Sequence, residues 1–391
     1  MPARQPLPYN ATAARINETL ERTVNAAIRT WDKVARPLGL GIRISNYDDL
    51  NYAFEGGVGD KLRKKHYDKS LRLLWKAEQH ASFTTFRDCT RDERAMMQLA
   101  EQGMTKLEKR ELKRVRSDEY RQQLKELYTP EQRQAIVNIL SLIGHGEAYA
   151  WIISNQLLGQ VKSTGGRAAL TMQVLEEAKH FVVLREVLEA FDCEIPRMQA
   201  WEYILLENIV RAKGLEKFFG MNVVVEGVAL SLFGLMGHSF PGLEFLKMFH
   251  LDESRHTGLP HSYFEEFPMT TWEKINPVAM NIRMLTVAPL IPLIFNVEKD
   301  FAVLGLDVFE FAGSVLRKIA HLTTRVGFYL PVPAPMLLWE INLMLNAYSY
   351  LTRPGHKFRN FMTAETTSGE EMLKVEAEAF ALKNQAPAAA S

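Results

Sequence analysis

The sequence predicts an all-α protein. From about residue 61 onward, apolar residues recur at helical spacing, and the Val, Ile and Thr alternation typical of strands is scarce. The sequence also contains two copies of a motif in which a glutamate and a histidine are three residues apart, a spacing that places both on one face of a helix. Of the 391 residues, 47% are hydrophobic, so the chain can bury a sizeable core as one large domain or two smaller ones.

Charge and cysteine content narrow the classes of function. Lys and Arg total 47 against 46 Asp and Glu, so the basic excess usual in a nucleic-acid-binding protein is missing, and we expect no nucleic-acid partner. Two cysteines, Cys89 and Cys193, cannot form a disulfide framework or a four-thiolate metal site. Because no apolar leader segment is visible either, we expect a cytoplasmic protein.

The most apolar stretch lies at 277–297. It contains Arg283, Pro289 and Pro292, so we expect no transmembrane helix there. A role as an interfacial segment or a lid stays open for this stretch.

Helix ends are legible along the chain. Thr129-Pro130-Glu131 is typical of an N-cap followed by proline at the first helical position, and predicts a helix to about Gln160. A loop at 163–166 then precedes a helix over about 167–191. The remaining predicted helices cover 11–34, 197–213, 215–237, 242–264, 276–296, 303–326 and 334–350.

This pattern divides the chain into four parts. They are an N-terminal helical extension (1–128), a four-helix core (129–265), C-terminal helices packed on that core (266–362) and a flexible tail (363–391).

The chemistry is predicted by two Glu-x-x-His motifs, Glu177-Ala-Lys-His180 and Glu253-Ser-Arg-His256. A separation of three residues on a helix places both side chains on one face, where both can reach one metal ion. A single copy is more often an ordinary surface pair. The second copy, and the helix that precedes each motif, favour a metal site.

Each preceding helix carries one glutamate in an apolar context, Glu147 and Glu226. Glu226 lies about 11 residues before the predicted turn at 237–242, and Glu253 about 11 residues after it, so both are roughly 17 Å from the turn. The two carboxylates are therefore expected at one level of an antiparallel hairpin. The distances of Glu147 and Glu177 from the loop that connects their helices differ by about one helical turn, and the geometry of that loop can compensate for the difference.

Charge supports the same interpretation. Four carboxylates inside an apolar bundle would each cost several kcal/mol if ionised and unpaired. Two divalent cations would neutralise them, and two neutral imidazoles would complete the set. Mixed carboxylate and imidazole ligands favour iron or manganese. The predicted metal ligands are Glu147, Glu177, His180, Glu226, Glu253 and His256.

The neighbours of the motifs are predicted to orient the ligands. These neighbours are Glu176, Lys179, Asp252 and Arg255. Metal-bound histidines usually donate their second N–H to a carboxylate, so we expect Glu176 to contact His256 and Asp252 to contact His180. His250, three residues before Glu253, is a candidate seventh ligand, although a core histidine is the simpler interpretation.

At these residues the sequence resembles the ribonucleotide-reductase-like branch of the ferritin-like superfamily, above all the di-iron hydroxylase subunits of bacterial multicomponent monooxygenases. The similarity covers about 130–265 and is carried by Gly146-Glu147-x-x-Ala150, Glu176-Glu177-x-Lys179-His180 and Asp252-Glu253-Ser-Arg255-His256. It implies a ferritin-like four-helix bundle with additional N- and C-terminal helices. It also implies two irons bridged by carboxylates and oxygen, which an external electron donor reduces and which react with dioxygen.

The sequence departs from the family pattern in three places. The separation of Glu226 and Glu253 is shorter than in the monooxygenases, which indicates another subfamily, and Leu230 replaces a frequent threonine. Leu184 stands near the position of the radical-bearing tyrosine of ribonucleotide reductases, so we do not expect radical storage of that kind.

We therefore expect an oxygen-dependent oxidoreductase acting on a small organic or acyl substrate with an apolar portion. Hydroxylation, desaturation and N-oxygenation stay open, as do a ferroxidase or iron-binding protein and a radical-generating subunit of a partner enzyme. No flavin, nicotinamide or iron–sulfur signature is visible, so a separate reductase or ferredoxin should supply electrons. A homodimer is also compatible with the sequence.

Overall fold

The computed structural model describes residues 5–35, 106, 118–161 and 164–363. Every regular element in these ranges is helical and none is a strand, which confirms the all-α class. The predicted tail lies outside the described residues apart from its first residue, as does most of the predicted N-terminal extension.

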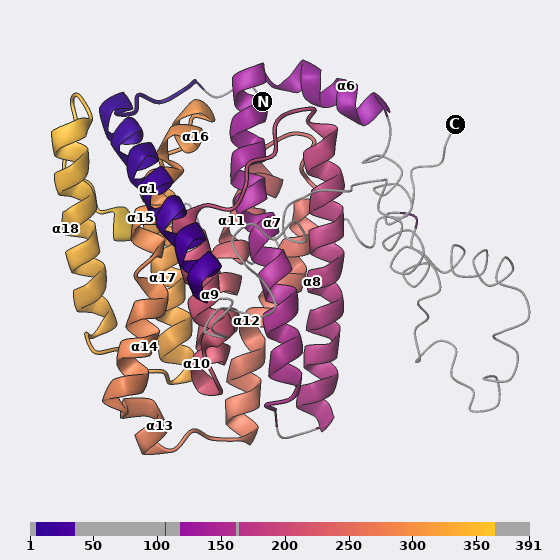
Figure 1. Ribbon diagram of the computed structural model, residues 1–391, viewed down its shortest axis with the longest axis vertical. Helices are drawn as coiled ribbons and strands as arrows, with labels where there is room; N and C mark the ends of the chain where they lie inside the picture. Colours follow the sequence, from indigo (N-terminus) through magenta and orange to yellow (C-terminus); the bar gives the residue numbers. More distant parts are fainter. Residues whose placement is uncertain (1–4, 36–105, 107–117, 162–163, 364–391) are drawn as a thin grey trace, which may run out of the picture.

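Two antiparallel hairpins dominate the structure. Helix α7 (Pro130–Leu158) pairs with α8 (Thr164–Ala190), and α11 (Glu226–Ser239) pairs with α12 (Leu246–Glu266). Figure 1 shows α7 and α8 running side by side along the long axis. Contacts of α12 with α8 join the two hairpins.

Helix α7 begins where the sequence predicts. Thr129 accepts a hydrogen bond from the Gln132 N–H, and the Gln132 side chain accepts one from the Thr129 N–H, so two otherwise unpaired donors are satisfied. Helix α8 instead begins at Thr164, so the predicted loop at 163–166 is wrong from residue 164 onward. Its glycines fall in the first turn, where the backbone N–H groups need no partner within the helix.

The helix predicted at 215–237 consists of three consecutive parts. A short α-helix, α10 (Leu215–Phe218), leads into a π-helix, η3 (Phe219–Val225), which continues into α11 at Glu226. The wider π turn changes the phase of the helix directly before Glu226. The apolar pattern of the sequence did not reveal this change.

The remaining described elements surround these hairpins. They are α1 (Ala11–Ala35), α6 (Asp118–Leu127), α9 (Ala200–Arg211), α13 (Thr271–Ile275), α14 (Pro277–Val287), α15 (Leu290–Asn296), α16 (Glu298–Val303), α17 (Val308–Val326), α18 (Ala334–Thr352) and η4 (Phe361–Thr363). Helix α17 packs against α11 and α12, whereas α9 and α16 pack against α7. Helix α1 crosses α9 and α15 on the near side in Figure 1. The predicted helix at 276–296 is divided at Pro289 into α14 and α15.

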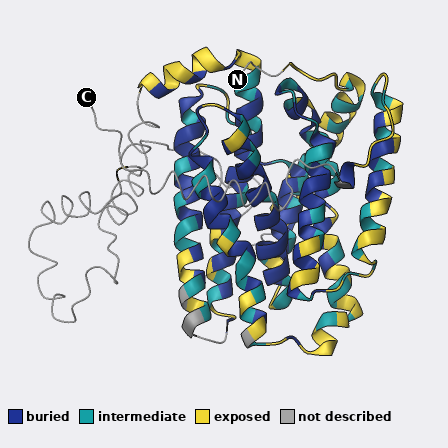
Figure 2. Cartoon of the chain, turned by 180° about the vertical axis from the view of Figure 1, so that it is seen from behind, coloured by how far each residue is buried: buried dark blue, intermediate teal, exposed yellow. Residues whose placement is uncertain are grey.

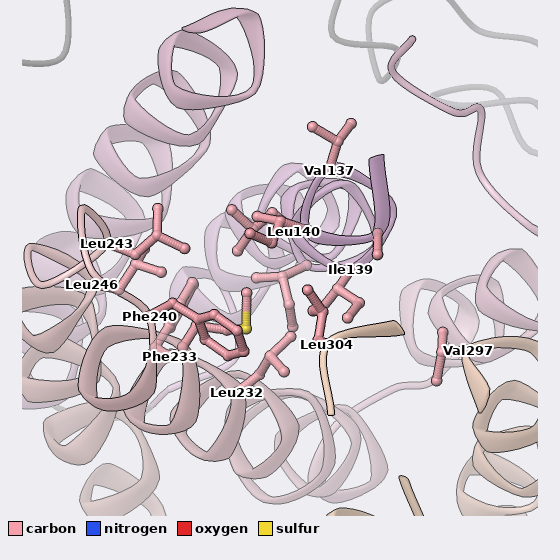
Figure 3. Close-up of a cluster of buried hydrophobic side chains, with 14 of the residues drawn as sticks. Val137, Ile139, Leu140, Leu232, Phe233, Phe240, Leu243, Leu246, Val297 and Leu304 are labelled. Carbon is pink, nitrogen blue, oxygen red and sulfur yellow. The ribbon is translucent and has the colours of Figure 1, made fainter. Parts of the chain in front are cut away.

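The core consists of two clusters of buried apolar side chains. One includes Val137, Ile139 and Leu140 of α7 together with Leu232 and Phe233 of α11; Figure 3 shows Leu140 on the side of α7 that faces Leu232 and Phe233. The other lies around the second half of α7, α9 and η3. Figure 2 shows that buried residues fill the interior of the helical assembly, while exposed residues lie on its outer helices.

Among the described residues, three helical segments are long and apolar enough to cross a membrane by length and composition: Pro130–Leu158, Leu215–Ser239 and Pro277–Asn296. The most apolar windows of the first two are 72% and 89% buried within the structure, so core packing accounts for them. The window of the third is only 33% buried.

A close backbone contact fixes the C-terminal end of the described chain. Gly313 of α17 faces the carbonyl group of Phe361, and a Cβ atom there would collide with it.

We expect Gly313→Ala to lower the free energy of unfolding by about 1–3 kcal/mol, because the collision is with backbone. Gly258→Ala in α12 is the matched control: a Cβ there meets nothing within 4 Å. It should raise stability by about 0.5–1 kcal/mol through helix propensity. Urea denaturation of both variants measures this, and a Gly313→Ala protein as stable as wild type would contradict the contact.

Candidate metal centre

Six buried glutamate and histidine residues converge in the middle of the two hairpins. They form two groups: Glu147, Glu177, His180 and Glu253, and Glu177, Glu226, Glu253 and His256. Within each group, one potential ligand atom per residue lies within 4.8 Å of all the others. No member is more than 3% exposed. All six residues predicted as ligands are thus brought together by the structure, and the groups could bind metal ions.

The two groups share two carboxylates. Glu177 and Glu253 belong to both, whereas the other four residues belong to one group each. The arrangement therefore has two centres, with one carboxylate from α8 and one from α12 lying between them.

The six residues form a polar layer between the two apolar clusters. On α7, residues up to Ala148 belong to one cluster and residues from Tyr149 onward to the other, with Glu147 at the boundary. The same change of cluster occurs around Glu177 on α8, at Glu226 and around Glu253 on α12. Each of the four helical segments thus crosses from one core to the other at the height of its ligand.

One ring nitrogen of each histidine points into this layer. His180 Nδ1 lies 2.9 Å from Glu253 Oε1 and 3.4 Å from Glu147 Oε2. His256 Nδ1 lies 2.9 Å from Glu253 Oε2 and 3.1 Å from Glu177 Oε1. Several of these buried atoms have no hydrogen bond of acceptable geometry, among them both oxygens of Glu177 and His180 Nδ1. Buried polar atoms are normally hydrogen-bonded, so their convergence is typical of ligands around a cation.

The other ring nitrogen of each histidine contacts a carboxylate. His180 Nε2 lies 3.0 Å from Asp252 Oδ2, and His256 Nε2 lies 2.9 Å from Glu176 Oε2. Both contacts are those predicted from the sequence. A proton on Nε2 that is donated to these carboxylates leaves the Nδ1 lone pair facing the polar layer.

Two cations hold these carboxylates from outside. Arg255 donates to Asp252 at 2.6 Å and to Glu176 at 2.7 Å, so one guanidinium joins both histidine partners. Lys179 donates to Asp252 at 2.7 Å. Burial opposes ionisation of Asp252, but Lys179 and His180 hold its pKa well below the usual value.

A further polar chain reaches the site from the π-helix. Asn222 donates to Gln173 Oε1 at 3.0 Å and to the His256 carbonyl at 3.0 Å, and Gln173 donates to Glu226 Oε1 at 2.8 Å. Asn222 is not among the residues that the sequence motifs predict for the site. The available signal was a lone amide in the apolar run Phe218–Val225, one turn before Glu226.

Aromatic rings fix the position of one imidazole. The Phe249 ring stacks on His180 with a centroid separation of 4.3 Å and meets Phe233 edge-on at 5.1 Å. These contacts restrict the rotation of His180 independently of its hydrogen bonds.

The structure does not bring His250 into either group. Its Nδ1 lies 2.8 Å from the Leu230 carbonyl oxygen of α11, so this ring nitrogen faces the neighbouring helix. The close approach relies on Gly234, where a Cβ would lie 3.0 Å from His250 Nδ1. His250 is therefore a core histidine at this position, which corrects its candidacy as a seventh ligand.

Protons balance the charge of the layer when no metal is bound. Burial raises the pKa of Glu147, and the charge of Glu253 adds to the effect; burial, Glu177 and Glu253 likewise raise the pKa of Glu226. Burial opposes the charged form of both imidazoles, but the surrounding carboxylates raise the pKa of His180 and of His256 well above the usual value. The folded state therefore takes up protons where a cation could bind.

No protein-family model, curated protein or solved structure matches this chain. The centre is therefore characterised by its own geometry: a buried cluster of carboxylates and imidazoles, oriented by outer hydrogen bonds, in an all-helical protein.

The proton uptake predicts how the stability of the metal-free protein depends on pH. Glu147 and Glu226 hold protons in the folded state above about pH 4.5, and His180 and His256 above about pH 6.5, where the unfolded chain has released them. The free energy of unfolding should fall from about pH 5 to 8, because each such group contributes up to about 1.4 kcal/mol per pH unit. Urea denaturation of chelator-treated protein across this range measures the slope.

The Glu147→Gln/Glu226→Gln variant serves as the control. It removes both carboxyl groups with raised pKa, so its slope should be shallower below about pH 6.5. Stability of the wild-type protein that increases with pH over this range would contradict the assignment.

Proposed function

We propose that this chain is a non-haem di-iron oxidoreductase with a ferritin-like four-helix core, which uses dioxygen to oxidise an organic substrate. The observation that carries the proposal is the pair of buried ligand groups that share Glu177 and Glu253. Two bound iron ions would supply the chemistry that activates dioxygen, once an external donor has provided electrons. Manganese in one position is compatible with the same ligands.

The residues fit two divalent cations by number and by chemistry. Four carboxylates carry four negative charges when ionised, which two divalent cations neutralise. The ligand atoms are carboxylate oxygens and imidazole nitrogens, and no thiolate is among them. Hard and intermediate cations such as iron and manganese prefer this set over the soft metals that select cysteine.

The surroundings favour oxidation of a substrate with an apolar portion. The two apolar clusters border the polar layer on either side and keep bulk water away from it. Phe233, Phe249 and Leu230 are among the buried apolar side chains on the segments that carry the ligands. Hydroxylation, desaturation and N-oxygenation are the reactions that this setting suits.

The outer hydrogen bonds suggest where electrons enter. Each imidazole reaches the Arg255 guanidinium through one carboxylate, His256 through Glu176 and His180 through Asp252. The Arg255 side chain is 53% exposed. A separate reductase or ferredoxin that binds over Arg255 would contact this guanidinium, which is two hydrogen bonds away from either histidine.

The shared carboxylates lead to a sharp prediction of metal content. Glu147→Ala and Glu226→Ala each damage one group and leave the other complete, so each variant should retain about one iron per chain. Glu177→Ala and Glu253→Ala each damage both groups and should retain less than either. Elemental analysis of protein purified from iron-supplemented cultures measures this, with about two irons per chain expected for wild type. Equal iron in all four variants and wild type would overturn the proposal.

The hydrogen bond from Asp252 to His180 predicts an effect on affinity. Asp252→Asn keeps the shape of the side chain but removes the charge that orients His180, so iron affinity should fall about 10–100-fold. Asp192→Asn is the matched control, because Asp192 pairs with Lys125 on the surface, away from the ligands. Competition with a chelator of known affinity gives both values. Equal affinities of the two variants would mean that Asp252 has no part in metal binding.

Oxygenation of the iron-loaded protein tests the reaction class. The protein is loaded anaerobically with ferrous iron and then exposed to dioxygen. About one equivalent of iron per site should be oxidised, and oxidation should then stop until reductant and substrate are added. Sustained oxidation of excess iron would identify a ferroxidase instead. A stable organic radical in the electron paramagnetic resonance spectrum would identify a radical-generating subunit.

A further inference from the structure

Exposed apolar side chains cover the outside of α14 and occur also on α13, where Glu273 is exposed as well. The exposed apolar residues are Trp272, Ile275, Val278, Ile282 and Leu285. Val278, Ile282 and Leu285 follow at intervals of four and three residues, so they lie along one side of α14; Trp272 and Ile275 belong to the preceding helix α13. We call these five residues the α13–α14 face. It belongs to the apolar segment that is only 33% buried, in contrast to the two similar segments that form the core.

The single charged residue of the segment Pro277–Asn296 points inward. Arg283 is fully buried and donates to the carbonyls of Glu273, Lys274 and Tyr329 and to the Glu216 carboxylate. The outward side of α14 consequently carries no charge.

The face also offers few hydrogen-bonding groups to a partner. The one exposed amide on α14, Asn281, already donates to the Pro277 carbonyl, and Thr286 is buried and donates to Ile282. Glu273 on α13 is engaged by the capping box with Thr270. Protein–protein interfaces carry about one hydrogen bond per 100–200 Å² and a polar rim. A lipid surface requires no such bonds, so lipid suits this face better than a protein.

The length of α14 determines how lipid would be contacted. Its 11 residues extend about 17 Å, whereas a hydrocarbon core is about 30 Å thick, so the helix cannot span it. A helix with one apolar side lies in the plane of the interface. Trp272, on α13 just before α14, has the amphipathic ring that is enriched at this depth, and the charges of the neighbouring Glu273 and Lys274 are opposite in sign.

We propose that the α13–α14 face binds the surface of a phospholipid bilayer, with α14 lying in the interfacial plane and Trp272 among the headgroups. Binding of this kind is reversible and leaves the metal centre inside the protein. It does not depend on the proposed reaction.

Co-sedimentation of the full chain with vesicles of phosphatidylcholine and phosphatidylglycerol, about three to one, tests the proposal. Leu285→Glu places a charge at a residue that is 63% exposed, so it should weaken vesicle binding at least about tenfold while thermal unfolding stays unchanged. Met172→Glu is the matched control. Met172 is 51% exposed on α8, on the other side of the structure, and this variant should bind as wild type does.

Two further measurements separate the outcomes. Vesicles should shift the tryptophan emission of wild type to shorter wavelength, and Trp272→Phe should reduce that shift. The proposal is overturned if wild type does not sediment with vesicles, or if both glutamate variants bind equally well. It is also overturned if sedimentation velocity shows a wild-type dimer that Leu285→Glu converts to monomer, because a second copy would then cover the face.

Discussion

The structure depends on one electrostatic constraint: six ionisable side chains lie in a layer between two apolar cores, and their charge has to be balanced there. Isolated charges in such a place would cost several kcal/mol each. Without metal, protons supply the balance, which is why the pKa of Glu147 and Glu226 and of both imidazoles is raised. Cations in the same place would displace those protons and bring the four helical segments together through shared ligands.

The orientation of the ligands does not rely on a cation. Arg255 joins Glu176 and Asp252, and these carboxylates hold the Nε2 atoms of His256 and His180 on two different helices. Gln173 of α8 holds Glu226 in the same way from the other hairpin, and Asn222 of η3 holds Gln173 in turn. Because the ligands are fixed by neighbours, little reorganisation would accompany metal binding, and the geometry of a pair of ions would be set by the protein.

Much of the fold and of the site could be predicted from the sequence because the relevant signals are local. The cap at Thr129 fixes the start of α7, and the three-residue spacing of each Glu-x-x-His motif places its glutamate and its histidine in the same ligand group. The π-helix could not be predicted, since all seven of its residues are buried, and a helix that is buried all round has no apolar stripe that would show a change of phase. The place of His250 was equally undetermined, because helical spacing gives the face of a residue but not the carbonyl that its ring meets across the helix pair.

Hydropathy has the same limitation for the apolar segments. By composition, α7, the segment Leu215–Ser239 and the segment Pro277–Asn296 would all suit a membrane, yet two of them enclose the polar layer. What distinguishes the third is the direction of a single side chain. Arg283 faces the protein, where its two terminal nitrogens donate to four oxygen acceptors, and this leaves the outer side of α14 without charge. A sequence records that an arginine interrupts an apolar run, but only the fold determines whether that arginine prevents contact with lipid or permits it.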